Sequence, residues 1–291
     1  RDRARCRLQP RCDALSDLRF LFFADMQLGC YASFTGMTTE EAASYLDRDM
    51  QVASMPRVEG FEWDARRYEQ AIATANELRP DFVIVGGDMI DDRSDAGQID
   101  EFFRITTLLN DEIPIRWVPG NHDAAFDSAT PTPESIEKYR SLFGDDYYCF
   151  EQGPALFIVM NTVVATRPER VPGEWEAQLD FLRGALAEAK SDQQVIVLGH
   201  HPLFVETADE ADSFWNVPLE RRSVLLDLLH EHGVRIGFAG HRHRNGQAWD
   251  RGFEMVTSGP VGFPLGNDPS GFRVVEVSED GVTHEYVALG E

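Results

Sequence analysis

The chain has 291 residues, of which 43% are hydrophobic and 26% charged, and its formal net charge is -23 at neutral pH. This acidic balance argues against nucleic-acid backbones and anionic lipid surfaces as general partners, because like charges repel. No apolar run is long enough to span a bilayer, and no signal segment is recognisable at the start of the sequence. The composition is typical of a soluble globular protein without low-complexity tracts.

The first residues differ in charge from the rest. Residues 1–16 contain five arginines, at positions 1, 3, 5, 7 and 11, in an otherwise acidic chain. We expect 1–16 to be a flexible basic extension and 17–291 to form one domain, because no repeat or Pro-, Gly- and Ser-rich linker divides it. Cys6, Cys12, Cys30 and Cys149 show no CxxC spacing and no disulfide framework, which favours a reducing, cytoplasmic compartment.

Continuous apolar runs in the first part of the chain predict strands that are covered on both faces. The strand at 19–24 ends in Asp25-Met-Gln27, and the strand at 82–85 ends in Gly-Gly-Asp88. Between them lie an insertion at 28–60, which includes a possible helix at 38–50, and a helix at 62–79. The order strand, helix, strand implies a parallel pair with a right-handed crossover.

The same alternation continues to the end of the chain. We predict helices at 99–109, 133–143, 174–190 and 219–232, and strands at 115–118, 147–150, 155–160, 195–198, 234–239, 254–257, 272–277 and 282–287. Gln152-Gly153 makes two of these strands a hairpin, so antiparallel pairing accompanies the parallel strands. An acidic, aromatic loop is predicted at 206–216.

Five predicted strands are followed by side chains that bind metal ions. These are Asp25 and Gln27, Asp88, Asn121 and His122, His200 and His201, and His241 and His243. Each segment alone also fits a turn, a helix cap or a surface pair. Together they indicate a metal site, because parallel strands present their carboxyl ends at one edge. Carboxylate, amide and imidazole donors suit Zn, Fe or Mn, and their number exceeds the need of one ion. Two metals bridged by an aspartate would use them all.

The motifs, in chain order, resemble those of the calcineurin-like metallophosphoesterases. They are Asp25-x-Gln27, Gly87-Asp88, Gly120-Asn-His-Asp123, Gly199-His200 and Gly240-His-x-His243. His-Pro-Leu-Phe at 201–204 and Leu265-Gly-x-Asp-Pro269 further resemble the CPPED-type calcineurin-like phosphoesterase domain-containing proteins, which are described as serine/threonine phosphatases. The resemblance implies a four-layer α/β/β/α sandwich, with two mixed sheets flanked by helices, and two divalent metal ions.

The resemblance also implies a ligand set. Asp88 would bridge both metals. One site would be completed by Asn121, His200 and His241, and the other would be held by Asp25, Gln27 and His243. The family usually has His where Gln27 stands, and a Gln oxygen is a weaker donor to Zn or Fe that suits Mn or Mg better. We therefore expect the Gln27 site to be the weaker one.

Two further residues receive catalytic roles from the resemblance. His122 matches the histidine that contacts the phosphate and protonates the leaving oxygen, and Asp91 matches the acid that orients this histidine. Asn121 and His122 would bind the substrate. His201 and Arg242 are expected to support the site by packing, whereas Arg244 and Asn245 could contact the substrate.

These roles predict a phosphomonoesterase that acts on a phosphoprotein or a small phosphorylated metabolite, by in-line attack of a metal-bridging hydroxide. Two alternatives remain: a phosphodiesterase for a cyclic nucleotide or a nucleotide-linked substrate, and a non-catalytic metal-binding scaffold. The many imidazoles disfavour the scaffold. Tyr31, Phe34, Phe214 and Trp215 either line the rim of the pocket or pack its loops onto the body. The sequence does not predict an oligomeric state.

Overall fold

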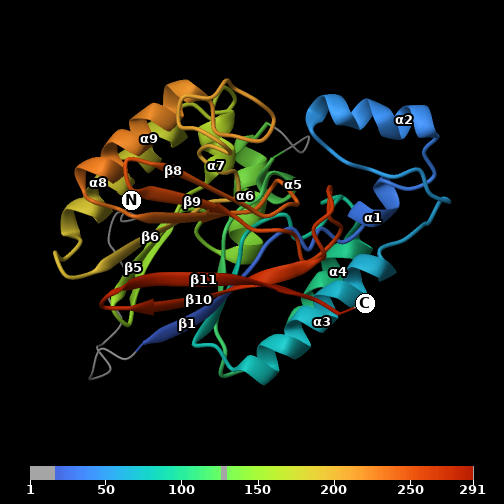
Figure 1. The fold of residues 1–291 in the computed structure, drawn as a ribbon, viewed down its shortest axis with the longest axis horizontal. Helices are drawn as coiled ribbons and strands as arrows, with labels where there is room; N and C mark the ends of the chain where they lie inside the picture. The colour runs from blue at the N-terminus through green and yellow to red at the C-terminus, as the bar shows by residue number, and fades with distance from the viewer. Residues whose placement is uncertain (1–16, 126–129, 291) are drawn as a thin grey trace.

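The structure is a computed structural model that describes residues 17–125 and 130–290; the predicted extension at 1–16 lies outside this part of the chain. The described strands form two mixed sheets (Figure 1). The first has the order β11-β10-β1-β2-β3 and consists of β1 (Leu18–Phe23), β2 (Phe82–Val85), β3 (Ile115–Trp117), β10 (Gly271–Ser278) and β11 (Gly281–Ala288). Its first three strands in sequence are parallel, and β10 and β11 are antiparallel.

The second sheet has the order β4-β5-β6-β7-β9-β8. Its strands are β4 (Tyr148–Gln152), β5 (Ala155–Val159), β6 (Gln194–Leu198), β7 (Ile236–Ala239), β8 (Gly246–Asp250) and β9 (Phe253–Thr257). The four central strands are parallel, and the two edge strands, β4 and β8, pair antiparallel with their neighbours. The predicted hairpin at Gln152-Gly153 is confirmed as β4 and β5.

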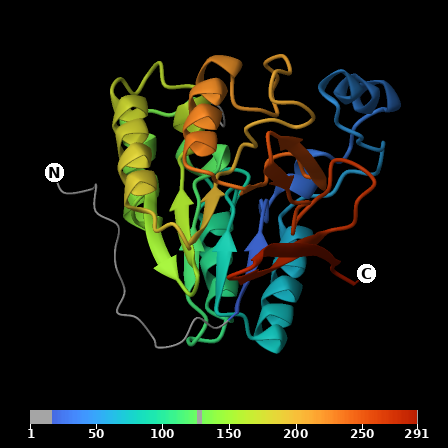
Figure 2. The same cartoon turned by 60° about the vertical axis from the view of Figure 1, so that its left-hand side comes forward.

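Helices cover the outer face of each sheet. The described helices are α1 (Cys30–Ser33), α2 (Thr39–Ser44), the 3-10 turn η1 (Tyr45–Arg48), α3 (Glu62–Leu78), α4 (Ala96–Thr106), α5 (Asn121–Ala124), α6 (Pro133–Phe143), α7 (Thr162–Thr166), α8 (Glu174–Glu188) and α9 (Leu219–Glu231). In Figure 2, α3 lies on one side of the strands and α8 and α9 on the other. The expected sandwich of two mixed sheets between helices is confirmed.

The position of strand β1 explains why its sequence is apolar without interruption from Phe20 to Phe23. Phe20 and Phe22 belong to the core between the two sheets, whereas Leu21 and Phe23 belong to the core under the helices of the first sheet. All four are fully buried. A strand in this position needs apolar side chains on both faces, so it lacks the alternation of a half-exposed strand.

Most predicted elements are present, and the differences have local causes. Helix α6 begins at Pro133 as predicted, because Thr132 caps it through the backbone of Ser135. Helix α4 begins at Ala96, three residues earlier than predicted, because the Asp95 side chain accepts from Gly97 N and Gln98 N. Strand β8 was not predicted. None of the described helices is long and apolar enough to cross a membrane.

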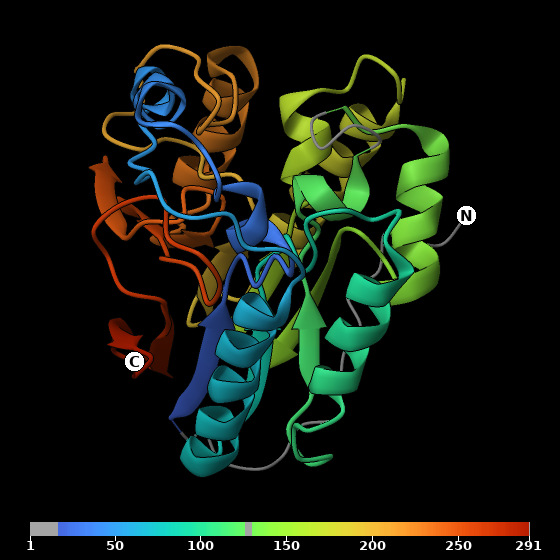
Figure 3. The same ribbon diagram turned by 90° about the vertical axis from the view of Figure 1, so that its right-hand side faces the viewer.

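The insertion at 28–60 packs onto the body through aromatic side chains. Tyr31 stacks on Trp63 with ring centroids 4.7 Å apart, and Phe34 stacks on Phe263 with centroids 6.0 Å apart. Trp215, from the loop at 206–216, donates from Nε1 to Arg48 O at 2.7 Å. Figure 3 shows the insertion and this loop together at one end of the molecule. Tyr31, Phe34 and Trp215 therefore hold the loops to the body, while Phe214 remains 52% exposed.

Candidate metal centre

The loops that follow the parallel strands gather at one end of both sheets (Figure 2). The loops after β1 and β2 continue the pairing of their strands: Asp25 N donates to Gly87 O at 3.1 Å, and Gln27 N donates to Asp88 O at 2.9 Å. An isolated bridge between Leu28 and Ile90 extends this contact. The two loops therefore fix Asp25, Gln27 and Asp88 relative to one another.

The second sheet brings its histidines to the same place. Gly240 N donates to His200 O at 3.0 Å, so the loops after β6 and β7 are joined. His241 N donates to both oxygens of Asp25, at 3.1 and 3.0 Å. The Asp25 carboxylate thus connects the two sheets, at a point where 216 residues of sequence separate the partners.

The side chains of the predicted ligands meet in a buried cluster. His200 Nε2 lies 3.1 Å from Asp88 Oδ2 and 3.9 Å from Asp25 Oδ1, and His243 Nε2 lies 3.4 Å from Asp25 Oδ1. Ligand atoms of Asp88, His200 and His241 all lie within 4.8 Å of one another. All of these residues are at most 4% exposed. Segments far apart in the sequence therefore form one centre.

Backbone carbonyl groups orient the three histidine rings. Carbonyl oxygens accept from His200 Nδ1 (Gly86 O, 2.9 Å), His241 Nε2 (Phe214 O, 2.9 Å) and His243 Nδ1 (Phe263 O, 2.6 Å). A carbonyl can only accept, so each of these nitrogens carries the proton. The other ring nitrogen of each histidine is left for the centre, where it can coordinate an ion once it carries no proton; this is the arrangement that metal-binding histidines require.

The ligand-bearing loops are held in an uncommon backbone conformation. Eight non-glycine residues in the described chain have a positive φ, and five of them are predicted ligands: Asp25 (52°), Gln27 (35°), Asp88 (53°), His241 (69°) and His243 (51°). This left-handed region costs energy for residues with a Cβ, and such residues concentrate at functional sites. Packing against the neighbouring loops holds the strain in place.

Glycine is required where the loops cross. A Cβ on Gly87, which has a φ of 96°, would lie 2.5 Å from His200 Nδ1 and 2.8 Å from the Cα of Gly120. A Cβ on Gly120 would lie 2.2 Å from Asp88 Oδ1. The glycines of two motifs therefore allow the loops after β2 and β3 to approach the centre closely.

Opposite charges balance within the cluster. Burial alone would raise the pKa of the Asp88 carboxyl, but His200 and His122 hold it below its ordinary value. Burial alone would lower the pKa of the His200 imidazole, but the Asp88 carboxylate raises it to about 9. Burial and the neighbouring His200 lower the pKa of His241 to about 3. The cluster therefore favours a positive charge next to Asp88, which is the charge that a cation supplies.

Two buried atoms test whether a cation fits. Within the part of the chain that the structure describes, Gln27 Oε1 is buried and lacks a hydrogen-bond partner, and buried His200 Nε2 has the Asp88 carboxylate 3.1 Å away without hydrogen-bond geometry. Unsatisfied buried polar atoms are costly, and both are atoms that coordinate divalent ions. With the carboxylates of Asp25 and Asp88 beside them, the residues present fit divalent metal ions.

His122 lies at the edge of this cluster, at the start of α5. Its backbone N donates to Asp88 Oδ1 at 2.9 Å, and its ring Nδ1 donates to the backbone carbonyl of Asp91 at 2.7 Å. The Asp91 carboxylate lies further from the ring, with Oδ1 3.7 Å from Nδ1. His122 Nε2 lies 3.2 Å from Gln27 Nε2. The His122 side chain is 21% exposed, so the ring reaches from the buried ligands to the surface of the site.

Two residues that support the centre had no predicted role. The buried carboxylate of Asp123 accepts from Asp88 N (2.7 Å), Met89 N (3.0 Å) and Gly120 N (3.0 Å). Thr162 Oγ1 accepts from His200 N at 3.0 Å and His201 N at 2.9 Å. Asp123 ends the Gly-Asn-His-Asp motif, which was the available signal; Thr162 lies in no motif.

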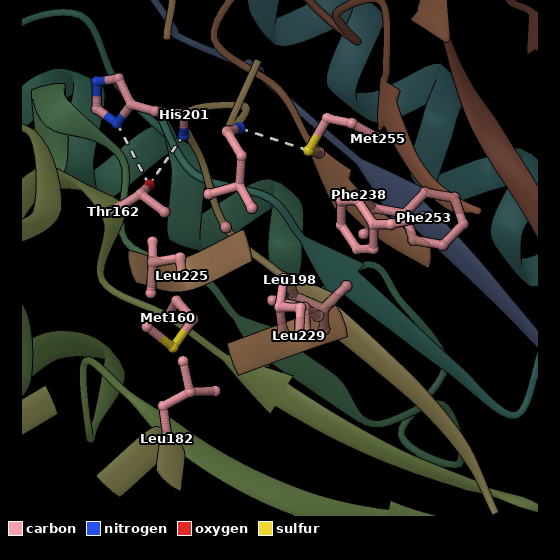
Figure 4. Close-up of a pocket in the computed structure, with 14 residues that line it drawn as sticks. Met160, Thr162, Leu182, Leu198, His201, Leu225, Leu229, Phe238, Phe253 and Met255 are labelled. Atoms are coloured by element: carbon pink, nitrogen blue, oxygen red, sulfur yellow. Dashed lines mark hydrogen bonds between the residues drawn. The ribbon is translucent and has the colours of Figure 1, made fainter. Parts of the chain in front are cut away.

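His201 packs beside the predicted ligands, with its ring centroid 4.2 Å from that of His241 and 5.2 Å from that of His200. Its Nδ1 lies 3.3 Å from Thr162 Oγ1, and the residue is also among those that line an apolar cavity of about 20 Å³ between β6, β7, α8 and α9 (Figure 4). Such a volume holds about one water molecule, so the cavity belongs to the core and is too small for a ligand.

The arginines and the asparagine near His243 have partners in the protein. Asp49 of the insertion binds Arg242 Nη2 at 3.2 Å and Arg244 Nη1 at 3.1 Å. Asn245 Oδ1 accepts from Gly259 N at 3.0 Å. These contacts favour a role in holding the loop after β7 over the expected substrate contacts of Arg244 and Asn245.

The fold and the centre define a metal-dependent phosphoesterase. A sequence profile described as calcineurin-like phosphoesterase matches residues 18–245, and the chain belongs to that family. Serine/threonine-protein phosphatase CPPED1 of Homo sapiens is 35% identical over 243 residues, which cover 80% of this chain and 76% of the human protein.

A more distant relative and a solved structure complete the comparison. The protein named "Probable cyclic nucleotide phosphodiesterase" of Rhodopseudomonas palustris is 29% identical over 245 residues, or 79% of this chain and 85% of that protein. The crystal structure of a dimetal phosphatase from Danio rerio shares the fold, with a TM-score of 0.60 at 17% identity over 94% of this chain and 97% of that chain.

Proposed function

We propose that this chain is a phosphomonoesterase with two divalent metal ions, Mn, Fe or Zn, and that it acts on phosphoserine or phosphothreonine in proteins. The buried cluster of Asp88, His200 and His241, with His122 beside Asp88, carries the proposal. The name of the human relative supports a phosphoprotein substrate. The cytoplasmic location predicted from the cysteines is part of the same proposal.

The ligands divide into two sets around Asp88. Asn121, His200 and His241 would hold one ion with Asp88, and Asp25, Gln27 and His243 would hold the other. When bound, such ions neutralise the charge of a phosphate and lower the pKa of water toward ~7. The carbonyl groups that orient the three histidines keep the ligand set in place before an ion binds.

His122 is placed to act on the substrate. Its Nδ1 is fixed by the Asp91 carbonyl, so Nε2 is the ring atom that faces the centre. From there, His122 can contact a phosphate oxygen and donate a proton to the departing oxygen of serine or threonine. Asn121, one residue earlier on α5, would bind the phosphate with it.

The surface beside the centre suits a protein substrate. A cleft of about 500 Å³ is bordered by Asn121, His201 and Phe214, and its far walls come from residues 166–169 and 212–221. The exposed ring of Phe214 lies 4.8 Å from that of His241. An open cleft of this kind admits a peptide segment next to the phosphate.

A substrate comparison tests the function. Metal-free protein, reloaded with Mn, Fe or Zn, would be assayed on a phosphoserine peptide, a phosphorylated metabolite, a cyclic nucleotide and a model diester. We expect the highest kcat/KM on the phosphopeptide. Preference for the diesters would favour the second candidate, a phosphodiesterase, which the Rhodopseudomonas relative supports by name. No turnover with any metal would favour a non-catalytic scaffold.

A further inference from the structure

The carboxylate of Asp91 makes a contact that its expected role does not explain. Gln27 Nε2 donates to Asp91 Oδ1 at 2.8 Å, whereas the ring of His122 is bonded to the backbone carbonyl of Asp91. The side chain and the main chain of Asp91 therefore bind different neighbours. The side chain binds Gln27, a predicted metal ligand.

This contact determines which way the Gln27 amide points. A carboxylate can only accept hydrogen bonds, so the NH₂ group of Gln27, and not its oxygen, must face Asp91. The same nitrogen lies 3.2 Å from His122 Nε2, which is an acceptor when the ring is neutral and Nδ1 carries the proton. Both Gln27 N–H groups then have partners. Its Oε1 is buried and has none among the described residues.

Asp91 is itself held on several sides. Ser33 Oγ donates to Asp91 Oδ2 at 2.6 Å, so both carboxylate oxygens are engaged. Asp91 N donates to Leu28 O at 3.0 Å and to Gln98 Oε1 at 3.1 Å. Gln98 is buried on α4 and also accepts from Asp92 N at 2.8 Å. The carboxylate is therefore fixed before any ion binds.

We propose that Asp91 is a positioning residue for Gln27, whose amide it turns so that Oε1 faces the cation site shared with Asp25 and His243. This role rests on the two-ion function proposed above. An amide that rotated by half a turn would place NH₂ against a cation, so the weaker ligand of the centre needs a partner that fixes it. With Asp91 in place, Gln27 can act as a metal ligand at the position where the family usually has histidine.

Metal titration separates this role from an action through His122. Asp91→Ala keeps the backbone carbonyl that binds His122, but removes the acceptor for Gln27. Calorimetric titration of the metal-free chain with Mn²⁺ should show two ions for the wild type. In Asp91→Ala one of them should bind about 10- to 100-fold more weakly, as expected when an outer partner of a ligand is lost. The other ion should bind as before.

Four further variants complete the experiment. Asp91→Asn keeps an acceptor oxygen and should retain most of the affinity. Gln27→Ala should lose the same site, and the double variant should lose no more than Gln27→Ala alone, because the two residues act as one unit. The matched control is Asp92→Ala, which removes a neighbouring exposed carboxylate that bonds Ser94 instead. It should bind both ions normally.

The outcomes distinguish the positioning role from the function on which it rests. Two ions bound with unchanged affinity in Asp91→Ala would overturn the positioning role alone. An equal loss in Asp92→Ala would show that charge, and not orientation, is responsible, and would overturn it too. A wild-type chain that binds one Mn²⁺ ion would overturn both the role and the two-ion function. Unfolding curves of every variant would show that each is folded.

Discussion

Removal of the Asp123 carboxylate should destabilise the protein in proportion to the hydrogen bonds that are lost. The side chain is 7% exposed and accepts from three backbone N–H groups, of Asp88, Met89 and Gly120. Each buried N–H left without an acceptor costs about 1–3 kcal/mol, so Asp123→Ala should lower the free energy of unfolding by roughly 3–6 kcal/mol once water fills part of the space.

The asparagine variant gives an intermediate value. Asp88 N and Gly120 N share Oδ2, so one amide oxygen can satisfy both, but the NH₂ group would then face Met89 N. Asp123→Asn should therefore cost about 1–3 kcal/mol, for one lost bond and one opposed pair of donors.

Urea unfolding in the presence of EDTA measures these differences without a contribution from bound ions. Burial and the Asp88 carboxylate raise the pKa of Asp123 to about 7, so the measurement belongs at pH 8, where the wild-type group is ionised. The control is Asp180→Ala, which removes an exposed carboxylate and should change little. Equal stability of the alanine and asparagine variants, or a loss below about 1 kcal/mol for alanine, would refute the reasoning.

Three other predictions concern separate parts of the chain. His122→Ala should keep its bound metal and lose about 10²- to 10⁴-fold in kcat, checked by metal analysis beside the assay; loss of metal as well would make His122 a ligand. Burial raises the pKa of Asp64 to about 8, despite two backbone N–H donors. The protonated Asp64 side chain therefore stabilises the fold fully below pH ~4, and this stabilisation is lost as pH rises through 8. Unfolding at pH 5 and pH 8 should therefore show a decline of up to about 1.4 kcal/mol per pH unit that Asp64→Asn lacks. The fully buried Arg222 donates to the carbonyls of Leu203, Glu210 and Val217, so Arg222→Leu should cost on the order of 2–3 kcal/mol and speed proteolysis of the loop at 206–216.

Much of the fold could be predicted because local chemistry and tertiary packing agree. Strand β1 lies between two cores, and its continuous apolar sequence shows it. Helix α6 has its cap and its proline in sequence. Strand β8 could not be predicted in this way, because it is an edge strand whose Trp249 is 60% exposed. Edge strands bury little apolar surface and therefore leave a weak pattern.

The convergence of the site's side chains could be predicted, but the contacts that hold them in place could not. Side chains after parallel strands converge whatever the loops contain, so Asp25, Asp88 and His200 were predicted together. Asp123 and Thr162 act through backbone groups 34 to 39 residues away, and such contacts leave no spacing pattern. The roles of the individual ligands, and the cytoplasmic location, stay predictions.

The two sheets supply different members of the centre, and this has a mechanical consequence. Asp25 and Asp88 follow strands of the first sheet, while His200, His241 and His243 follow strands of the second. A bound cation would therefore link the two sheets directly, at the edge where they meet. When the metal is removed, amide hydrogens in the loops where the two sheets meet should exchange with solvent first. Amide hydrogens next to the aromatic core between the sheets should stay protected.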